Sequence, residues 1–109
     1  MNKVQDLHRQ AMDLAEQAEL EKRRGDATQV QDMLRQALAL EAEAARLVAD
    51  DLETEPTRSV LHRSAAPLAV ECQDLQMAEK LIAVALAGMP PADIAEELKD
   101  LFIQINLRK

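Results

Sequence analysis

The sequence predicts an all-α fold, and three observations lead to that prediction. Hydrophobic residues make up 48% of the 109 residues, yet only Phe102 is aromatic, so the apolar content is mostly Ala and Leu, which are strong helix formers. Only two Gly and four Pro interrupt the chain. Small and apolar positions in two stretches recur at one offset (66 − 18 = 48; 85 − 37 = 48), and such self-similarity is typical of stacked helical hairpins. We therefore expect two antiparallel helical hairpins followed by one capping helix.

The first hairpin is predicted over residues 2–51. A helix over residues 2–24 carries one apolar stripe at steps of three and four, formed by Val4, Leu7, Ala11, Leu14 and Ala18. Gly25 ends this helix, because Gly tolerates the left-handed conformation that closes many helices. Asp26 is suited to cap a second helix over residues 27–51. Since so few residues separate the two helices, they should fold back on each other.

The second hairpin is predicted over residues 57–88, after a loop rich in acidic residues. Its first helix covers 57–72 and contains Pro67, which removes the hydrogen bond that the carbonyl of Arg63 would otherwise accept. We expect a kink or a loosened turn there. The turn at residues 73–74 mirrors the turn at residues 25–26, and the second helix covers 75–88.

The end of the second hairpin is predicted from a glycine and two prolines. Gly88 is expected to close the helix over 75–88, and Pro90 and Pro91 prevent its continuation. A last helix is predicted over 91–106, with acidic residues in its first turns as the helix dipole favours. No long linker divides the chain, so residues 1–109 are interpreted as one domain.

The charge of the chain argues against two classes of partner. The formal net charge is −7 and there is no basic stripe, so the electrostatic footprint of a nucleic-acid-binding protein is missing. The longest apolar run, residues 81–89, is far shorter than a membrane span. The first six residues lack the apolar core of a signal peptide, and a single cysteine excludes an internal disulfide. We therefore expect a cytoplasmic protein that binds neither nucleic acid nor membrane.

The sequence offers no recognisable catalytic or metal-binding pattern. There is no Gly-x-Ser-x-Gly setting for a nucleophile and no glycine-rich phosphate loop. His8, His62 and Cys72 are not at the spacing of zinc ligands, and Cys72 is interpreted as a small buried side chain. We expect no enzyme activity, no metal and no cofactor.

The stretch from Ala66 to Pro90 resembles a tetratricopeptide repeat (TPR). Small residues where paired helices cross, and a proline after the second helix, fall at the spacing of that family in Ala66, Ala78, Ala85 and Pro90. The resemblance implies a TPR-like right-handed superhelix, with the helix over 91–106 as its solvating end helix. It also implies that the chain binds another protein.

The same resemblance implies a groove lined by the first helix of each hairpin. Projected onto this sequence, the groove residues are Glu19, Lys22, Arg23, Val60, Arg63 and Val70. Arg63 with Lys22 or Arg23 would bind a carboxylate of a peptide, because charge-assisted hydrogen bonds are the strong ones. The alternative interpretation is that these cations are ordinary surface residues.

Three functions stay open on the sequence alone. The first is an adaptor that binds a protein or peptide partner of unknown identity. The second is a homo-oligomeric assembly protein, in which the stripe of the first helix, close to heptad spacing, packs against a second copy. The third is a small acidic chaperone.

Overall fold

The computed structural model describes residues 2–108, and the prediction of an all-α fold is confirmed for them. The elements are α1 (Lys3–Arg24), α2 (Ala27–Val48), the short 3-10 helix η1 (Leu52–Thr54), α3 (Thr57–Glu71), α4 (Leu75–Leu86) and α5 (Ala92–Arg108). Helix α2 ends three residues before the predicted position 51, and part of the predicted acidic loop forms η1.

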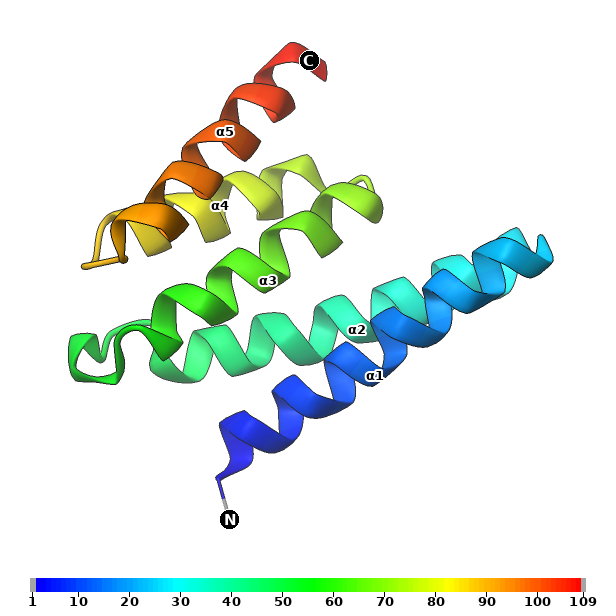
Figure 1. The fold of residues 1–109 in the computed structure, drawn as a ribbon, viewed down its shortest axis with the longest axis horizontal. Coiled ribbons are helices and arrows are strands. Elements are labelled where there is room, and N and C mark those ends of the chain that lie inside the picture. Colours follow the sequence, from blue (N-terminus) through cyan, green and yellow to red (C-terminus); the bar gives the residue numbers. More distant parts are fainter. Residues whose placement is uncertain (1, 109) are drawn as a thin grey trace.

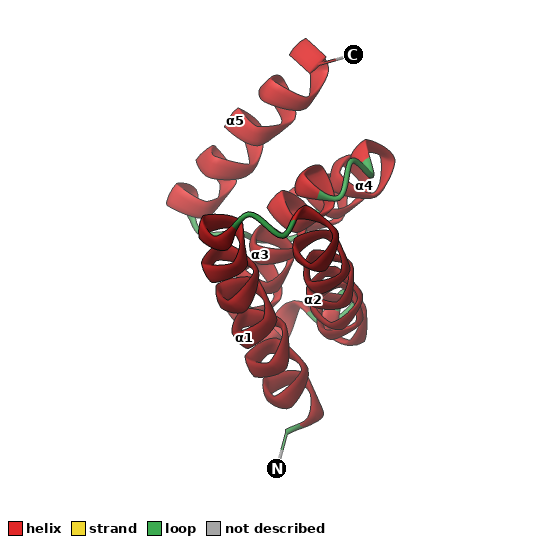
Figure 2. Cartoon of the chain, turned by 90° about the vertical axis from the view of Figure 1, so that its right-hand side faces the viewer, coloured by secondary structure: helices red, strands yellow, loops and turns green. Residues whose placement is uncertain are grey.

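The helices form a thin slab. The slab measures 41 × 40 × 20 Å, and its short dimension equals two helix diameters. Helices α1, α3 and α5 run in one direction, and α2 and α4 run in the opposite direction (Figure 1). Seen from the side, α1 and α5 lie to the left of α2 and α4 (Figure 2). Helix α3 packs against both α2 and α4, and α5 packs against both α3 and α4.

The two tight turns are built alike, as the 48-residue offset predicts. Gly25 ends α1 with φ 89°, and Gln73 follows α3 with φ 62°. Asp26 accepts a hydrogen bond from the backbone N–H of Gln29 (3.1 Å). Asp74 accepts one from the N–H of Met77 (3.0 Å). Each turn therefore combines one left-handed residue with one aspartate cap.

Gln73 is the less suitable of the two left-handed residues, because only glycine adopts this conformation without a steric cost. We expect Gln73→Gly to raise the free energy of unfolding by about 0.5–1 kcal/mol. Gly25→Ala should lower it by about 1 kcal/mol. An added Cβ at Gly25 would meet no atom within 4 Å, so that loss reports backbone strain alone. Urea denaturation of both variants checks this, and a stabilised Gly25→Ala would contradict it.

Five alanines at positions of the 48-residue repeat and of the expected helix crossings are fully buried. They are Ala18, Ala37, Ala66, Ala78 and Ala85, each with an exposed fraction of 0%. Small side chains allow helix axes to approach to the short end of the roughly 8–10 Å range. Larger residues such as Ile82 and Leu98 fill the core between these crossings.

The crossings should not tolerate a larger side chain. We expect Ala66→Leu to cost about 1–3 kcal/mol of unfolding free energy, because the added methylene groups overpack a closed interface. Ala39→Leu, at an exposed position of α2, makes the same chemical change outside the core and should be nearly neutral. Chemical denaturation measures both, and equal midpoints for the two variants would show that Ala66 is not at a tight crossing.

The apolar stripe of α1 is covered within the chain. Val4 and Leu7 pack against a small cluster formed by α2 and α3, which contains Val48 and Leu61. Leu14 packs against the main core. The heptad-like face that the sequence offered to a second copy is therefore used inside the monomer.

Gly88 has a different role from the predicted one. Helix α4 ends at Leu86 with Ala87 as its right-handed cap, and the left-handed residues of the described chain are Gly25 and Gln73. A Cβ atom at Gly88 would collide with the guanidinium group of Arg58. Glycine at position 88 leaves room for the Arg58 side chain, and its backbone conformation is not one that requires glycine.

Arg58 is buried and joins the ends of two helices. Its exposed fraction is 3%. Its Nε donates to the carbonyl of Ala49 (2.6 Å) after α2, and its Nη2 donates to the carbonyl of Val84 (2.6 Å) in the last turn of α4. The last carbonyls of a helix have no partner within the helix, so one side chain from the start of α3 satisfies both ends.

Glu55 completes this buried network. Its carboxylate accepts hydrogen bonds from the N–H (2.9 Å) and hydroxyl (2.7 Å) of Ser59 and from the N–H of Met89 (3.1 Å). Burial acts to raise the pKa of Glu55, but these hydrogen bonds and the charge of Arg58 outweigh it, so the pKa lies below its ordinary value. The carboxylate is therefore the charged partner that Arg58 needs.

Candidate functional site

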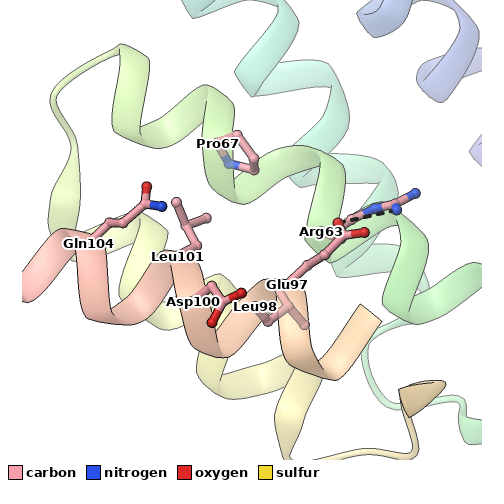
Figure 3. A pocket seen from close by; sticks show the side chains of 7 residues that line it. All are labelled: Arg63, Pro67, Glu97, Leu98, Asp100, Leu101 and Gln104. Carbon is pink, nitrogen blue, oxygen red and sulfur yellow. Dashed lines mark hydrogen bonds and ion pairs between the residues drawn. The ribbon is translucent and has the colours of Figure 1, made fainter. Parts of the chain in front are cut away.

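A groove of about 250 Å³ lies between α3 and α5 (Figure 3). Its lining combines apolar and polar side chains: Arg63 and Pro67 from α3, and Glu97, Leu98, Asp100, Leu101 and Gln104 from α5. The groove opens on one side of α3, next to the helix that was expected only to cap the fold.

The sequence of α5 explains why one groove has an apolar floor and a polar edge. Leu98 is 1% exposed and Leu101 is half-buried, because steps of three and four place both on the face toward the core. Glu97, Asp100 and Gln104 are also spaced by three and four, and each comes one position before a residue of the inner face. They therefore lie side by side along the edge of that face and remain exposed. A ligand in the groove would meet leucines below and hydrogen-bonding groups along the edge.

Pro67 removes one backbone N–H donor from the part of α3 that lines this groove. Helix α3 remains helical on both sides of Pro67. Proline has no N–H, so the carbonyl of Arg63 lacks the donor that residue i+4 normally supplies. Residues i and i+4 share a face of a helix, and Pro67 is exposed on the groove. The carbonyl of Arg63 therefore lacks the N–H that a residue other than proline would donate from position 67.

A weak ion pair spans the groove. Arg63 Nη1 lies 3.4 Å from Glu97 Oε2, and the two side chains are 36% and 56% exposed (Figure 3). Exposed pairs of this kind contribute about 0–1 kcal/mol. A carboxylate or carbonyl of a bound segment can therefore replace Glu97 as the acceptor at little cost.

The residues predicted on α1 lie at a different place from Arg63. Lys22 pairs with Glu19 (2.9 Å) and lies 3.6 Å from Glu71 at the end of α3. The hydrogen bond to Glu19 raises the pKa of Lys22. Arg23 is exposed. The α1 residues therefore meet the last turn of α3.

The structure gives Arg63 and the α1 cations of the predicted carboxylate site different partners. Arg63 is eight residues before Glu71 (71 − 63 = 8), which is about 12 Å along a helix, and it contacts Glu97 of α5 instead. Val60 is half-buried against the core, and Val70 is 9% exposed within it. Among the six predicted residues, Arg63 is the one that lines the α3–α5 groove.

Sequence reasoning missed the α5 side of this groove. Glu97, Asp100 and Gln104 stand at steps of three and four, the same spacing that reveals an apolar stripe. That polar stripe was the available signal. Acidic residues near the start of a helix also suit its dipole, so the sequence alone does not mark this stripe as the edge of a groove.

Sequence reasoning also missed a partly buried contact between His8 of α1 and Glu41 of α2. Glu41 is fully buried, and His8 Nδ1 lies 2.7 Å and 3.0 Å from its two carboxylate oxygens. Burial raises the pKa of Glu41, while His8 and the Ser64 hydroxyl act in the opposite direction. The contact links α1 to α2. The sequence predicts residue 41 only as part of a helix and gives no sign of this partner.

The raised pKa of Glu41 gives a pH dependence with a definite sign. A carboxyl whose folded pKa lies above its unfolded value binds protons more tightly when folded, so stability falls as pH rises through the window above the ordinary value of 4.5. Glu41→Gln removes this titration. We therefore expect the unfolding free energy of the variant, relative to the parent, to increase from pH 4.5 to pH 7.5. Urea melts across this range check it, and a difference that is constant or falls with pH would contradict it.

Within residues 2–108, no three His, Cys, Asp or Glu side chains are grouped to hold a metal ion, and none of the described helices is long and apolar enough to cross a membrane. Comparisons with family models, curated proteins and solved structures gave no match to this chain.

Proposed function

We propose that this chain is a non-enzymatic interaction module that binds an extended segment of a partner protein in the α3–α5 groove. The observation that carries the proposal is the groove itself, which sets Arg63 beside an apolar floor formed by Leu98 and Leu101. Pro67 adds to it, because a proline inside α3 supplies no N–H to the carbonyl of Arg63.

The chemistry of the groove suits an extended peptide. Such a segment carries backbone N–H and C=O groups that have no partner of their own. The Arg63 carbonyl accepts from an N–H, the Arg63 guanidinium donates to a C=O, and the Gln104 amide does both. Leu98 and Leu101 provide the apolar floor for one side chain. An extended chain matches this groove, because its backbone groups can pair with the polar edge while one side chain packs on the leucines.

The order and direction of the helices support the same proposal. They are compatible with a TPR-like right-handed stack of the pairs α1–α2 and α3–α4, with α5 at its end. In such a stack the first helices of each pair line the concave face. The proposed groove would then be the end of that face.

Self-association is a second candidate function, favoured by one observation. Helix α5 exposes three large apolar side chains, Phe102, Ile103 and Leu107, at 42%, 57% and 82%. Light scattering across a dilution series tests it, with Ile103→Asp as the variant. A dimer that Ile103→Asp dissociates would favour self-association. A monomer at all concentrations would exclude self-association, and the adaptor function would then be the one candidate left.

The adaptor proposal is tested by selecting linear peptides from a random display library on the immobilised chain. Fluorescence anisotropy then measures the affinity of the selected peptides for the parent, Arg63→Glu and the matched control Arg23→Glu. We expect Arg63→Glu to weaken binding about tenfold or more and Arg23→Glu to leave it within about twofold. Circular dichroism melts establish that both variants are folded. Failure to enrich any peptide, or equal loss in both variants, would overturn the proposal.

A further inference from the structure

A second cavity, of about 260 Å³, lies on a different face of α3. Its walls come from α2, with Ala42 and Arg46, and from α4, with Leu81 and Val84. Helix α3 packs against both α2 and α4, so its residue His62 forms the floor between these walls. Because Arg63 and Pro67 lie on another face of α3, this cavity is separate from the α3–α5 groove.

His62 presents an unused hydrogen-bond acceptor. Its Nδ1 lies 2.7 Å from the carbonyl of Arg58, and since a carbonyl only accepts, Nδ1 carries the proton. Burial lowers the pKa of His62, so the ring is neutral at pH 7. Nε2 then carries a lone pair and makes no hydrogen bond within residues 2–108. The residue is only 2% exposed, and it lines the cavity.

Two cations stand at the rim of the same cavity. Arg46 is held by Glu43 through two hydrogen bonds of 2.7 Å and 2.8 Å. Lys80 is exposed and has no ion-pair partner in the described part of the chain. A ligand with one negative charge near the rim would therefore be complementary to Lys80.

We propose that this cavity binds a tyrosine side chain of a partner protein, with its hydroxyl donating to His62 Nε2 and an adjacent acidic residue paired with Lys80. A side chain that fits the walls must be apolar along its length. To pair with the floor, it must carry a neutral hydrogen-bond donor at its end. Tyrosine has both, whereas the tryptophan N–H lies on the flank of its ring and serine has no apolar body. This goes beyond the proposed function, because it is a second site with its own specificity.

The test uses NMR titration of the full chain with three capped dipeptides: acetyl-Tyr-Glu-amide, acetyl-Phe-Glu-amide and acetyl-Tyr-Gln-amide. The ring nitrogen shifts of His62 provide a direct readout of a new hydrogen bond at Nε2. Ala42→Leu fills the cavity, and Ala39→Leu on the exposed face of α2 is its matched control. Lys80→Gln removes the rim charge, and Lys99→Gln on α5 is the corresponding control.

We expect acetyl-Tyr-Glu-amide to bind in the millimolar range, to move the Nε2 resonance of His62, and to bind about threefold to tenfold more tightly than either analogue. Ala42→Leu should abolish this binding and Lys80→Gln should weaken it to the level of the Gln dipeptide. The two controls should bind like the parent. Equal affinity for the Tyr and Phe dipeptides, an unmoved Nε2 resonance, undiminished binding to Ala42→Leu, or no binding at about 5 mM would each overturn the proposal.

Discussion

Arg58→Met is expected to lower the free energy of unfolding by about 3–5 kcal/mol. The substitution keeps much of the apolar length of the side chain but removes the buried charge opposite Glu55. It also leaves the carbonyls of Ala49 and Val84 without donors in a buried place. Breaking one half of a buried charged pair costs far more than a surface pair contributes. Equilibrium denaturation in urea gives the value.

Arg35→Met is the matched control, because Arg35 pairs with Asp32 on the surface and is 65% exposed. Its effect should stay within about 0.5 kcal/mol. A cycle with Gly88→Ala sharpens the test: the added Cβ collides with the guanidinium, so Gly88→Ala should be harmful in the parent and much less so in Arg58→Met. If the two substitutions add independently, or if Arg58→Met costs no more than Arg35→Met, the buried network does not hold the helix ends together.

Pro67→Ala is expected to raise stability and weaken peptide binding at the same time. Alanine restores an N–H that bonds the carbonyl of Arg63, and it replaces the residue least suited to a helix interior by the one most suited, so we expect a gain of about 1–3 kcal/mol. The same new bond occupies the carbonyl that is proposed to accept from the peptide. Selected peptides should therefore bind about threefold to tenfold more weakly, the value of one hydrogen bond.

These opposite effects separate the proposal from a general disturbance of the fold. Urea melts and anisotropy titrations are made on the same preparations. Pro91→Ala, placed before α5 and outside the groove, should leave peptide affinity unchanged. Stabilised Pro67→Ala with full peptide affinity would mean that the Arg63 carbonyl does not take part in binding.

The helices and their turns could be predicted because their signals are local. The left-handed Gly25 and the caps Asp26 and Asp74 act on residues within three positions in sequence, and the structure places them as predicted. The burial of the alanines on the apolar stripes was predicted for the same reason, since apolar spacing fixes the inner face of a helix. The end of α2 was less well predicted, because no proline or glycine marks it.

The buried polar residues could not be predicted, because their partners are distant in sequence. Arg58 is buried only because the ends of α2 and α4, nine and 26 residues away, meet at the start of α3. Glu41 is buried because His8 lies opposite it, 33 residues earlier. A charged side chain in a helical pattern reads as a surface residue until such partners are known. The polar stripe of α5 can be seen in the sequence, but it marks the edge of a groove only because α3 lies beside it.

Amide chemical-shift mapping is the sharpest test of whether an extended segment binds between α3 and α5. A peptide selected on the parent chain is titrated into ¹⁵N-labelled protein. We expect the largest shifts at residues 63–66 of α3 and 97–104 of α5, with α1 unmoved. Largest shifts on the last turns of α1, around Glu19 and Arg23, would contradict it.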